Sequence, residues 1–133
     1  MPHRCIADLA RRFESGELEP ECFRHADHIC VAWELLSRHP FFEALTRLRA
    51  GLKQLAARAG RPGAYHETIT LAFLAIVYER LNKTGGSDWE RFAGDNPDLF
   101  DKNALRALYS TPRLTSPAAR LGFLLPDLCG TPA

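Results

Sequence analysis

Residues 71–78 read Leu-Ala-Phe-Leu-Ala-Ile-Val-Tyr and contain no charged side chain. The run lies in a segment with helical spacing of its apolar residues, which starts near Tyr65 or His66 and ends before Gly85 and Gly86. A helix that is apolar around most of its circumference is stable when other parts of the protein cover it. The run is also far shorter than the roughly 20 residues that cross a membrane. It therefore predicts the central helix of an all-α domain.

Three more segments show the spacing of amphipathic helices, at residues 6–14, 22–38 and 40–59. Proline or glycine follows each of them, and His39-Pro40 separates the second from the third. The residue before a proline disfavours the helical region, so one helix is expected to end there and the next to begin. With the central segment, these predict about four main helices.

Shorter helices are predicted in the C-terminal third. Ser87 followed by Glu90 is a capping-box pattern that opens one of them. Ser116 before Pro117 opens another, because serine caps helices and proline is favoured at their first position. The mostly apolar residues 121–128 are expected to dock on the domain. The predicted fold is a compact helical bundle with short C-terminal helices and a docked tail.

Length and charge limit the classes of partner. The 133 residues suit one domain, which is expected to span residues 1–133. The net charge of +1 gives no electrostatic reason to expect nucleic acid. The four cysteines form no Cys-x-x-Cys pair, and charged residues interrupt the N-terminus where an export signal would be apolar. The sequence thus predicts a cytoplasmic protein with reduced thiols, a small-molecule partner and no membrane or nucleic-acid partner.

Three of the five histidines fall on apolar helix faces. His25 and His28 are three residues apart and are therefore neighbours on one helix, while His66 belongs to the apolar face of the central helix. Three neutral imidazoles with one open position form a recognised zinc site, which also suits iron, nickel or copper. The sequence predicts a divalent transition metal bound by these three histidines between two helices, with zinc or iron ahead of nickel or copper.

Four other residues are candidates for chemistry beside this site. Glu67 projects about 100° away from His66 on a helix, so it is interpreted as a catalytic base or an orienting residue. Tyr65 would donate a hydrogen bond to substrate, and Arg113 and Arg120 would bind an anionic substrate. Each has a structural alternative: interaction with the helix dipole for Glu67, packing for Tyr65, and surface ion pairs for the arginines.

Two sequence blocks carry a resemblance. The pattern F-x-H-x-x-H at residues 23–28 and the pattern Y-H-E-T-I-T at residues 65–70, with a less specific block around Arg113 and Arg120, resemble a family of small uncharacterised bacterial proteins. The resemblance covers residues 21–128. It implies no particular activity. It does imply that five residues belong to one site, with Arg113 and Arg120 associated less specifically. The five are His25, His28, Tyr65, His66 and Glu67.

Two classes of function are consistent with these observations. In the first, the chain is a metal-dependent enzyme, such as a hydrolase, lyase or oxygenase, whose metal activates water or polarises a substrate oxygen. In the second, it is a non-enzymatic binding or assembly module, or a small-molecule sensor, and its histidines form a buried polar cluster. In that case the apolar tail or the Phe41-Phe42 face would pack on a partner or a second copy, as in a homodimer.

Overall fold

The uncharged run lies in helix α4 (Glu67–Thr84), which packs against helices on several sides. In the computed structural model, which describes residues 6–86 and 88–128, α4 contacts α2 (His25–Arg38), α3 (Phe41–Arg58) and α7 (Pro117–Leu121). Leu74 and Val77 of α4 are fully buried. The described residues form helices and turns without a strand, and the predicted all-α class is confirmed.

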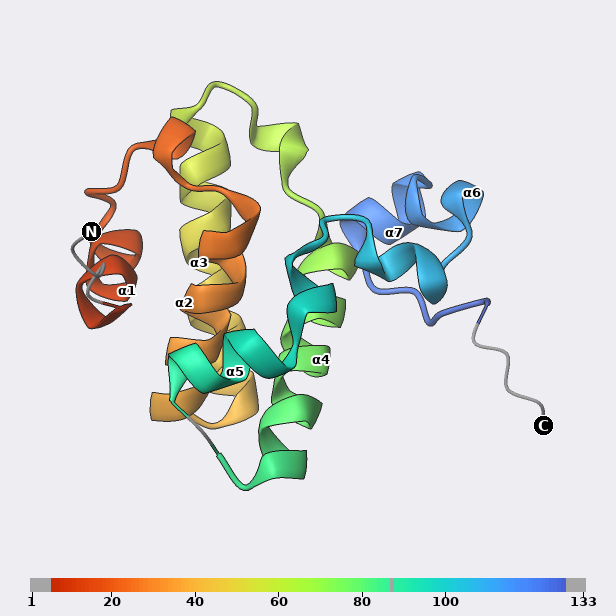
Figure 1. Cartoon of the computed structure of the whole chain (residues 1–133). Helices are drawn as coiled ribbons and strands as arrows, with labels where there is room; N and C mark the ends of the chain where they lie inside the picture. Colours follow the sequence, from red (N-terminus) through yellow and green to blue (C-terminus); the bar gives the residue numbers. More distant parts are fainter. Residues whose placement is uncertain (1–5, 87, 129–133) are drawn as a thin grey trace.

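The remaining elements surround this centre (Figure 1). Helix α1 lies at one side of α2 and α3, whereas α6 and α7 lie at the other side, beside the N-terminal end of α4. Short 3₁₀ turns, labelled η, connect several helices. The other elements are α1 (Ile6–Ser15), η1 (Pro20–Cys22), η2 (Pro62–Ala64), α5 (Trp89–Asp95), η3 (Pro97–Phe100), η4 (Ala104–Ala107) and α6 (Thr111–Leu114).

Two helix starts differ from the prediction. Helix α2 begins at His25 rather than near residue 22, because Pro20–Cys22 forms the turn η1 and Arg24 is extended. The Asp27 carboxylate accepts a hydrogen bond from the backbone N–H of Arg24 and fixes this start. Ser87 lies outside the described residues, and the N-cap of α5 is Asp88, whose side chain accepts from the backbone N–H of Arg91.

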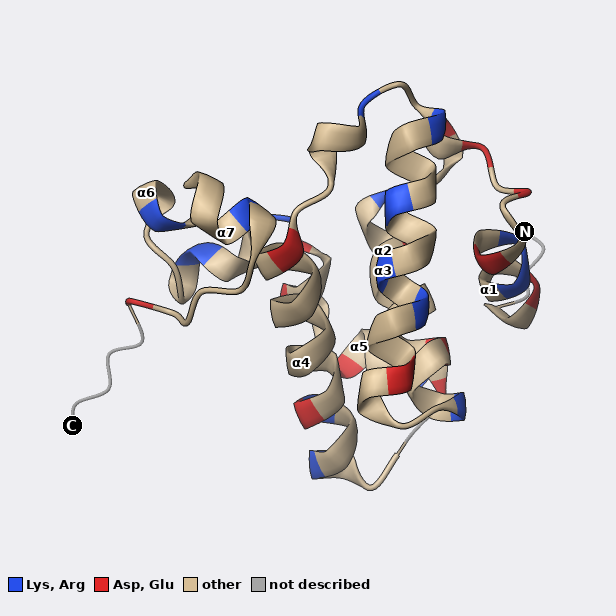
Figure 2. Cartoon of the chain, turned by 180° about the vertical axis from the view of Figure 1, so that it is seen from behind, with Lys and Arg blue, Asp and Glu red and all other residues tan. Residues whose placement is uncertain are grey.

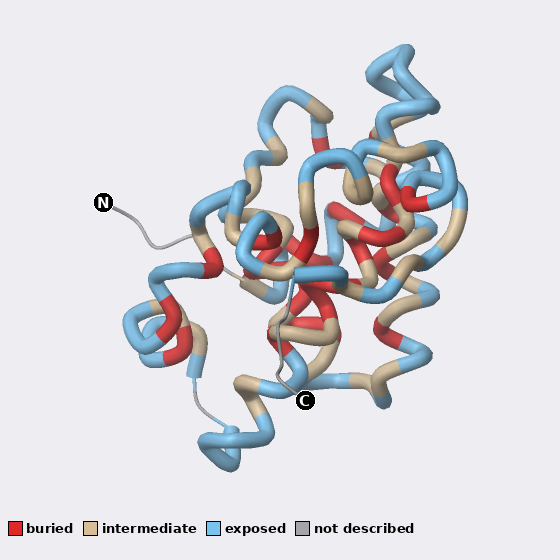
Figure 3. Tube along the Cα trace, turned by 90° about the vertical axis from the view of Figure 1, so that its right-hand side faces the viewer, coloured by how far each residue is buried: buried red, intermediate tan, exposed pale blue. Residues whose placement is uncertain are grey.

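The core consists mainly of buried side chains of α1, α2, α3 and α4, with Phe92, Leu99, Leu105 and Tyr109 from the segments after α4. Figure 3 shows many of the buried residues gathered in the middle of the fold. Helices α1 and α3 approach closely because α3 carries a glycine at the contact. A Cβ atom on Gly51 would lie 2.3 Å from the ring of Phe13, which is buried in α1. This glycine is therefore required by packing, since no larger residue fits beneath the ring.

The C-terminal tail docks through hydrogen bonds. The Thr68 hydroxyl donates to the carbonyl of Gly122 and accepts from the backbone N–H of Leu124, and the Tyr109 hydroxyl donates to the carbonyl of Leu124. The apolar side chains of the tail stay largely in solvent, with Leu121 82% exposed. Polar contacts, rather than burial of these leucines, hold the tail on α4.

The charged side chains of α3 follow one of its faces. Figure 2 shows lysine and arginine positions recurring along this helix. Leu48 and Leu55 on the opposite face are buried, as expected for an amphipathic helix. Across the part of the chain that the structure describes, none of the helices has the length and apolar character needed to cross a membrane.

Candidate ligand cavity

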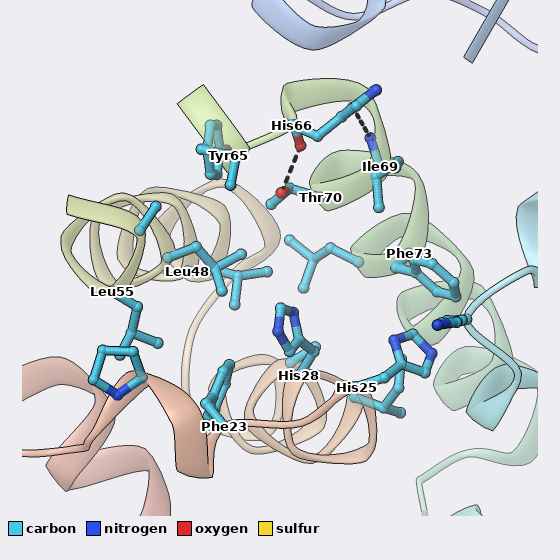
Figure 4. A pocket seen from close by; sticks show the side chains of 18 of the residues that line it. Phe23, His25, His28, Leu48, Leu55, Tyr65, His66, Ile69, Thr70 and Phe73 are labelled. Carbon is cyan, nitrogen blue, oxygen red and sulfur yellow. Dashed lines mark hydrogen bonds between the residues drawn. The ribbon is translucent and has the colours of Figure 1, made fainter. Parts of the chain in front are cut away.

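A cavity of about 420 Å³ opens between α2, α3 and α4. Most of its wall is aliphatic or aromatic, and a few polar side chains interrupt it (Figure 4). The apolar lining residues are Pro20, Phe23, Ile29, Ala32, Leu48, Leu52, Leu55, Ala56, Ala59, Ala64, Ile69, Phe73 and Leu74. The polar ones are His25, His28, Tyr65, His66, Thr70 and Lys102. This volume and composition fall within the range found for small-molecule pockets in proteins.

The ring of His28 projects into this cavity (Figure 4). It lies against Phe23, with 4.5 Å between the ring centroids. Neither ring nitrogen makes a hydrogen bond to any residue that the structure describes. Burial, and then the neighbouring His25, lower the pKa of His28 to about 4, so the ring is neutral at pH 7. A neutral imidazole has one donor and one acceptor, and both remain free for a ligand.

His25 is anchored at the cavity edge. Its Nε2 lies 2.9 Å from the carbonyl oxygen of Leu99, and its ring meets Phe73 edge-on at 5.0 Å. Because a carbonyl only accepts, Nε2 carries the proton, and Nδ1 is the acceptor of the neutral ring. The centroids of the His25 and His28 rings are 6.2 Å apart. The two histidines therefore face one cavity, as their spacing predicts.

His66 has a structural task. It is the N-cap of α4, and its Nδ1 accepts a hydrogen bond of 3.1 Å from the backbone N–H of Ile69. Its Nε2 lies 2.7 Å from the carbonyl of Leu114, to which it donates. Figure 4 shows its ring turned away from those of His25 and His28. Both nitrogens are thus in use, and neither has a lone pair free for a metal ion.

The three histidines line one cavity, but their donor atoms do not converge. Among residues 6–86 and 88–128, no group of three His, Cys, Asp or Glu side chains is placed to hold a metal ion. His66 uses both ring nitrogens, in its capping bond and in its bond to Leu114, whereas His25 uses only Nε2 and keeps the Nδ1 lone pair. The arrangement described here therefore does not fit the three-histidine metal site expected from His25, His28 and His66.

Glu67 and Tyr65 form a polar cluster with a residue that the sequence did not single out. The guanidinium of Arg49 binds both carboxylate oxygens of Glu67 at 2.7 Å, and the Tyr65 hydroxyl donates to Oε1 at 2.5 Å. Arg49 holds the pKa of Glu67 below its ordinary value. Burial, and then Glu67, raise the pKa of Tyr65 to about 12. Glu67 is a paired carboxylate, and only Tyr65 of these three lines the cavity.

Sequence spacing does not reveal the role of Arg49. It lies among several basic residues of α3 whose spacing predicts a solvated face, and 18 positions separate it from Glu67. Their pairing depends on how α3 and the start of α4 are placed in space, which helical periodicity does not specify.

Arg113 and Arg120 do not line the cavity. The Nε of Arg113 donates to the carbonyl of Leu125, and one terminal nitrogen of Arg120 donates to the carbonyls of Gly63, Ala64 and Tyr65. The two arginines hold the tail and the segment before α4. Neither of the alternatives considered for them describes this role, because each uses its guanidinium on backbone carbonyls.

Comparison with known protein families, with curated proteins and with solved structures gives no match to this chain, so the resemblance at residues 23–28 and 65–70 stays a prediction.

Proposed function

We propose that this chain is a small-molecule-binding module that takes one mainly apolar ligand into the cavity between α2, α3 and α4. The observation that carries the proposal is His28. It places a neutral imidazole without a hydrogen-bonding partner among the described residues in a wall made mostly of aliphatic and aromatic side chains. An apolar pocket with a few convergent polar groups is the usual form of a binding site. The apolar wall provides affinity, and His28 orients the ligand.

Binding without turnover is better supported than catalysis. Glu67 is held by Arg49 and Tyr65 and is not part of the cavity wall. His66 has no free nitrogen, which removes both the third metal ligand and a candidate base. A general base needs to reach the proton it abstracts, and a nucleophile needs a base beside it. The metal-dependent enzyme is accordingly the weaker candidate.

The experiment fills the cavity with a larger side chain. Ala56 of α3 lines the cavity, whereas its neighbour Ala57 is exposed on the outer face of the same helix. Ala56→Phe and Ala57→Phe therefore add the same atoms inside and outside the site. The probe is N-phenyl-1-naphthylamine, an uncharged apolar dye that fluoresces on leaving water.

We expect saturable binding of one dye molecule to the unmodified protein. Ala56→Phe should weaken it at least about tenfold, because the phenyl ring displaces the dye from apolar contacts. Ala57→Phe should leave it unchanged. Circular dichroism checks that both variants are folded. The absence of saturable binding by the unmodified protein, or equal binding by the two variants, contradicts the proposal.

A further inference from the structure

The cavity wall contains a cationic side chain but no acidic one among the described residues. The wall contains three imidazoles, the Tyr65 phenol and the Lys102 ammonium group, and no aspartate or glutamate among the described residues. Of the carboxylates next to wall residues, Glu67 is neutralised by Arg49, and Asp27 accepts the backbone N–H of Arg24 at the start of α2. Glu19 pairs with Arg58, Asp101 accepts the backbone N–H of Asn103, and Glu21 is exposed. Lys53 adds a second cation outside the wall, 5.4 Å from the centre of the Tyr65 ring.

Lys102 and His28 belong to the same cavity but come from opposite parts of the chain. Lys102 follows η3, and η3 is tied to α2 by the bond between the Leu99 carbonyl and His25. Lys102 is exposed, so it reaches the cavity from its solvent side, whereas His28 lies deeper. A ligand group that accepts hydrogen bonds would meet an ammonium group and an imidazole N–H, both of which donate.

We infer that the ligand is an apolar carboxylate, whose acid group is received by His28 and Lys102 and whose hydrocarbon part lies against the leucine and phenylalanine side chains of the wall. This inference rests on the proposed function. A cationic ligand would find no carboxylate among the described residues of the wall and would be repelled by Lys102. A neutral ligand would gain the apolar contacts but not the ion pair. A hydrogen bond to a charged group contributes roughly twice as much as one between neutral groups.

The same wall accommodates straight-chain and ring-shaped hydrocarbons, and both are included in the test. Decanoate, decanol and decylamine share one chain and differ in the charge of the end group, and 2-naphthoate provides a ring. Each is titrated at pH 7 below its solubility limit or micelle-forming concentration, by displacement of N-phenyl-1-naphthylamine and by calorimetry. The order expected is decanoate, then decanol, then decylamine, with decanoate at least about tenfold tighter than decylamine. Comparison of decanoate with 2-naphthoate identifies the preferred hydrocarbon shape.

Variants locate the acid group. His28→Leu and Lys102→Met should each weaken decanoate about tenfold and change decanol binding by less than about threefold. Lys83→Met is the matched control, because Lys83 is an exposed lysine of α4 that does not line the cavity. His28→Gln retains a hydrogen-bond donor and should recover part of the decanoate affinity if His28→Leu alters the fold. The His28 ring resonances should shift on addition of decanoate and less with decanol.

The outcomes separate the two claims. If the dye binds and all three ten-carbon compounds displace it equally, the carboxylate inference is wrong and the binding function stands. The carboxylate inference is also wrong if Lys102→Met binds decanoate as tightly as the control Lys83→Met and if both His28 variants bind it as tightly as the unmodified protein. If neither the dye nor any of the compounds binds, the proposed function itself fails.

Discussion

The imidazole of His66 performs a task that serine, threonine, asparagine or aspartate performs at most helix starts. Its Nδ1 accepts the backbone N–H of Ile69, three residues into α4, and its Nε2 bonds the Leu114 carbonyl on a different element. One ring thus satisfies an orphan backbone donor of the helix and ties the C-terminal segment to it. The same buried position makes the ring a candidate ligand in the sequence, because burial of a histidine indicates a partner but not its identity.

Replacement of His66 should show this double role. His66→Ala removes the cap and leaves the Leu114 carbonyl without its donor, so the free energy of unfolding should fall by about 2 kcal/mol. His66→Asn keeps a capping oxygen but is too short to replace the second bond, and it should recover about half of the loss. Urea denaturation measures both values. Equal stability of the two variants would contradict a capping role.

His28 should make the fold sensitive to acid. Its pKa is about 4 in the folded protein and about 6.5 when unfolded, so the unfolded chain binds more protons between these values. The contribution of His28 to stability should therefore be fully present well above pH 6.5. It should fall by about 3 kcal/mol as the pH decreases through 4, and it should level off about one pH unit below 4. Denaturation of the unmodified protein and of His28→Leu from pH 7.5 to 4 measures the difference. Parallel curves would show that His28 is not buried as a neutral ring.

At the scale of elements, the contact between α1 and α3 depends on Gly51. Gly51→Ala would normally stabilise a helix by about 1 kcal/mol, but here the new Cβ meets the ring of Phe13. We expect a net destabilisation of about 1–3 kcal/mol because the ring is buried and has no free space to move into. Gly94→Ala in α5 is the control, since its added atom meets nothing within 4 Å among residues 6–86 and 88–128. Thermal melting of both variants compares them, and an unchanged melting temperature for Gly51→Ala would count against the close packing.

The helices were the part most open to prediction from sequence, because apolar spacing and proline or glycine breaks are local signals. They gave the all-α class and placed His25 and His28 on one inward face. The helix starts were less accurate where a local turn competes, as at η1 before α2. The pairing of Arg49 with Glu67, and the use of His66 as a cap, depend on the spatial placement of separate elements and have no local signal.

At the scale of the whole molecule, the cavity lies where three helices fail to fill the space between them. Its wall combines residues of α2, α3 and α4 with Lys102 from the segment after η3. The apolar side chains of the wall are available to contact a ligand. Polar groups that already have hydrogen-bonding partners contribute little to ligand binding. The shape and apolar character of the cavity therefore follow from how the helices pack. His28 is the side chain that provides it with free hydrogen-bonding groups.

Metal removal should leave this structure unchanged. With no described group of three His, Cys, Asp or Glu side chains placed to hold an ion, protein purified without an affinity tag should keep its melting temperature and its dye affinity after dialysis against EDTA. Subsequent addition of zinc should leave both unchanged. Elemental analysis accompanies the melts. Stoichiometric zinc whose removal lowers the melting temperature would restore the metal-dependent hypothesis.

The hydrogen bonds at the start of α4 also determine when this part of the fold can form during synthesis of the chain. Leu114 and Arg120 contact His66 and residues 63–65 across 48 to 57 positions of the chain. A ribosome releases Leu114 and Arg120 after residues 63–66, so the part of the wall that carries Tyr65 and His66 is secured only once residues 114–120 have emerged. A nascent or C-terminally shortened chain would thus form most of its helices before its cavity is complete. During that time its apolar wall would be exposed to chaperones and proteases that recognise apolar surface.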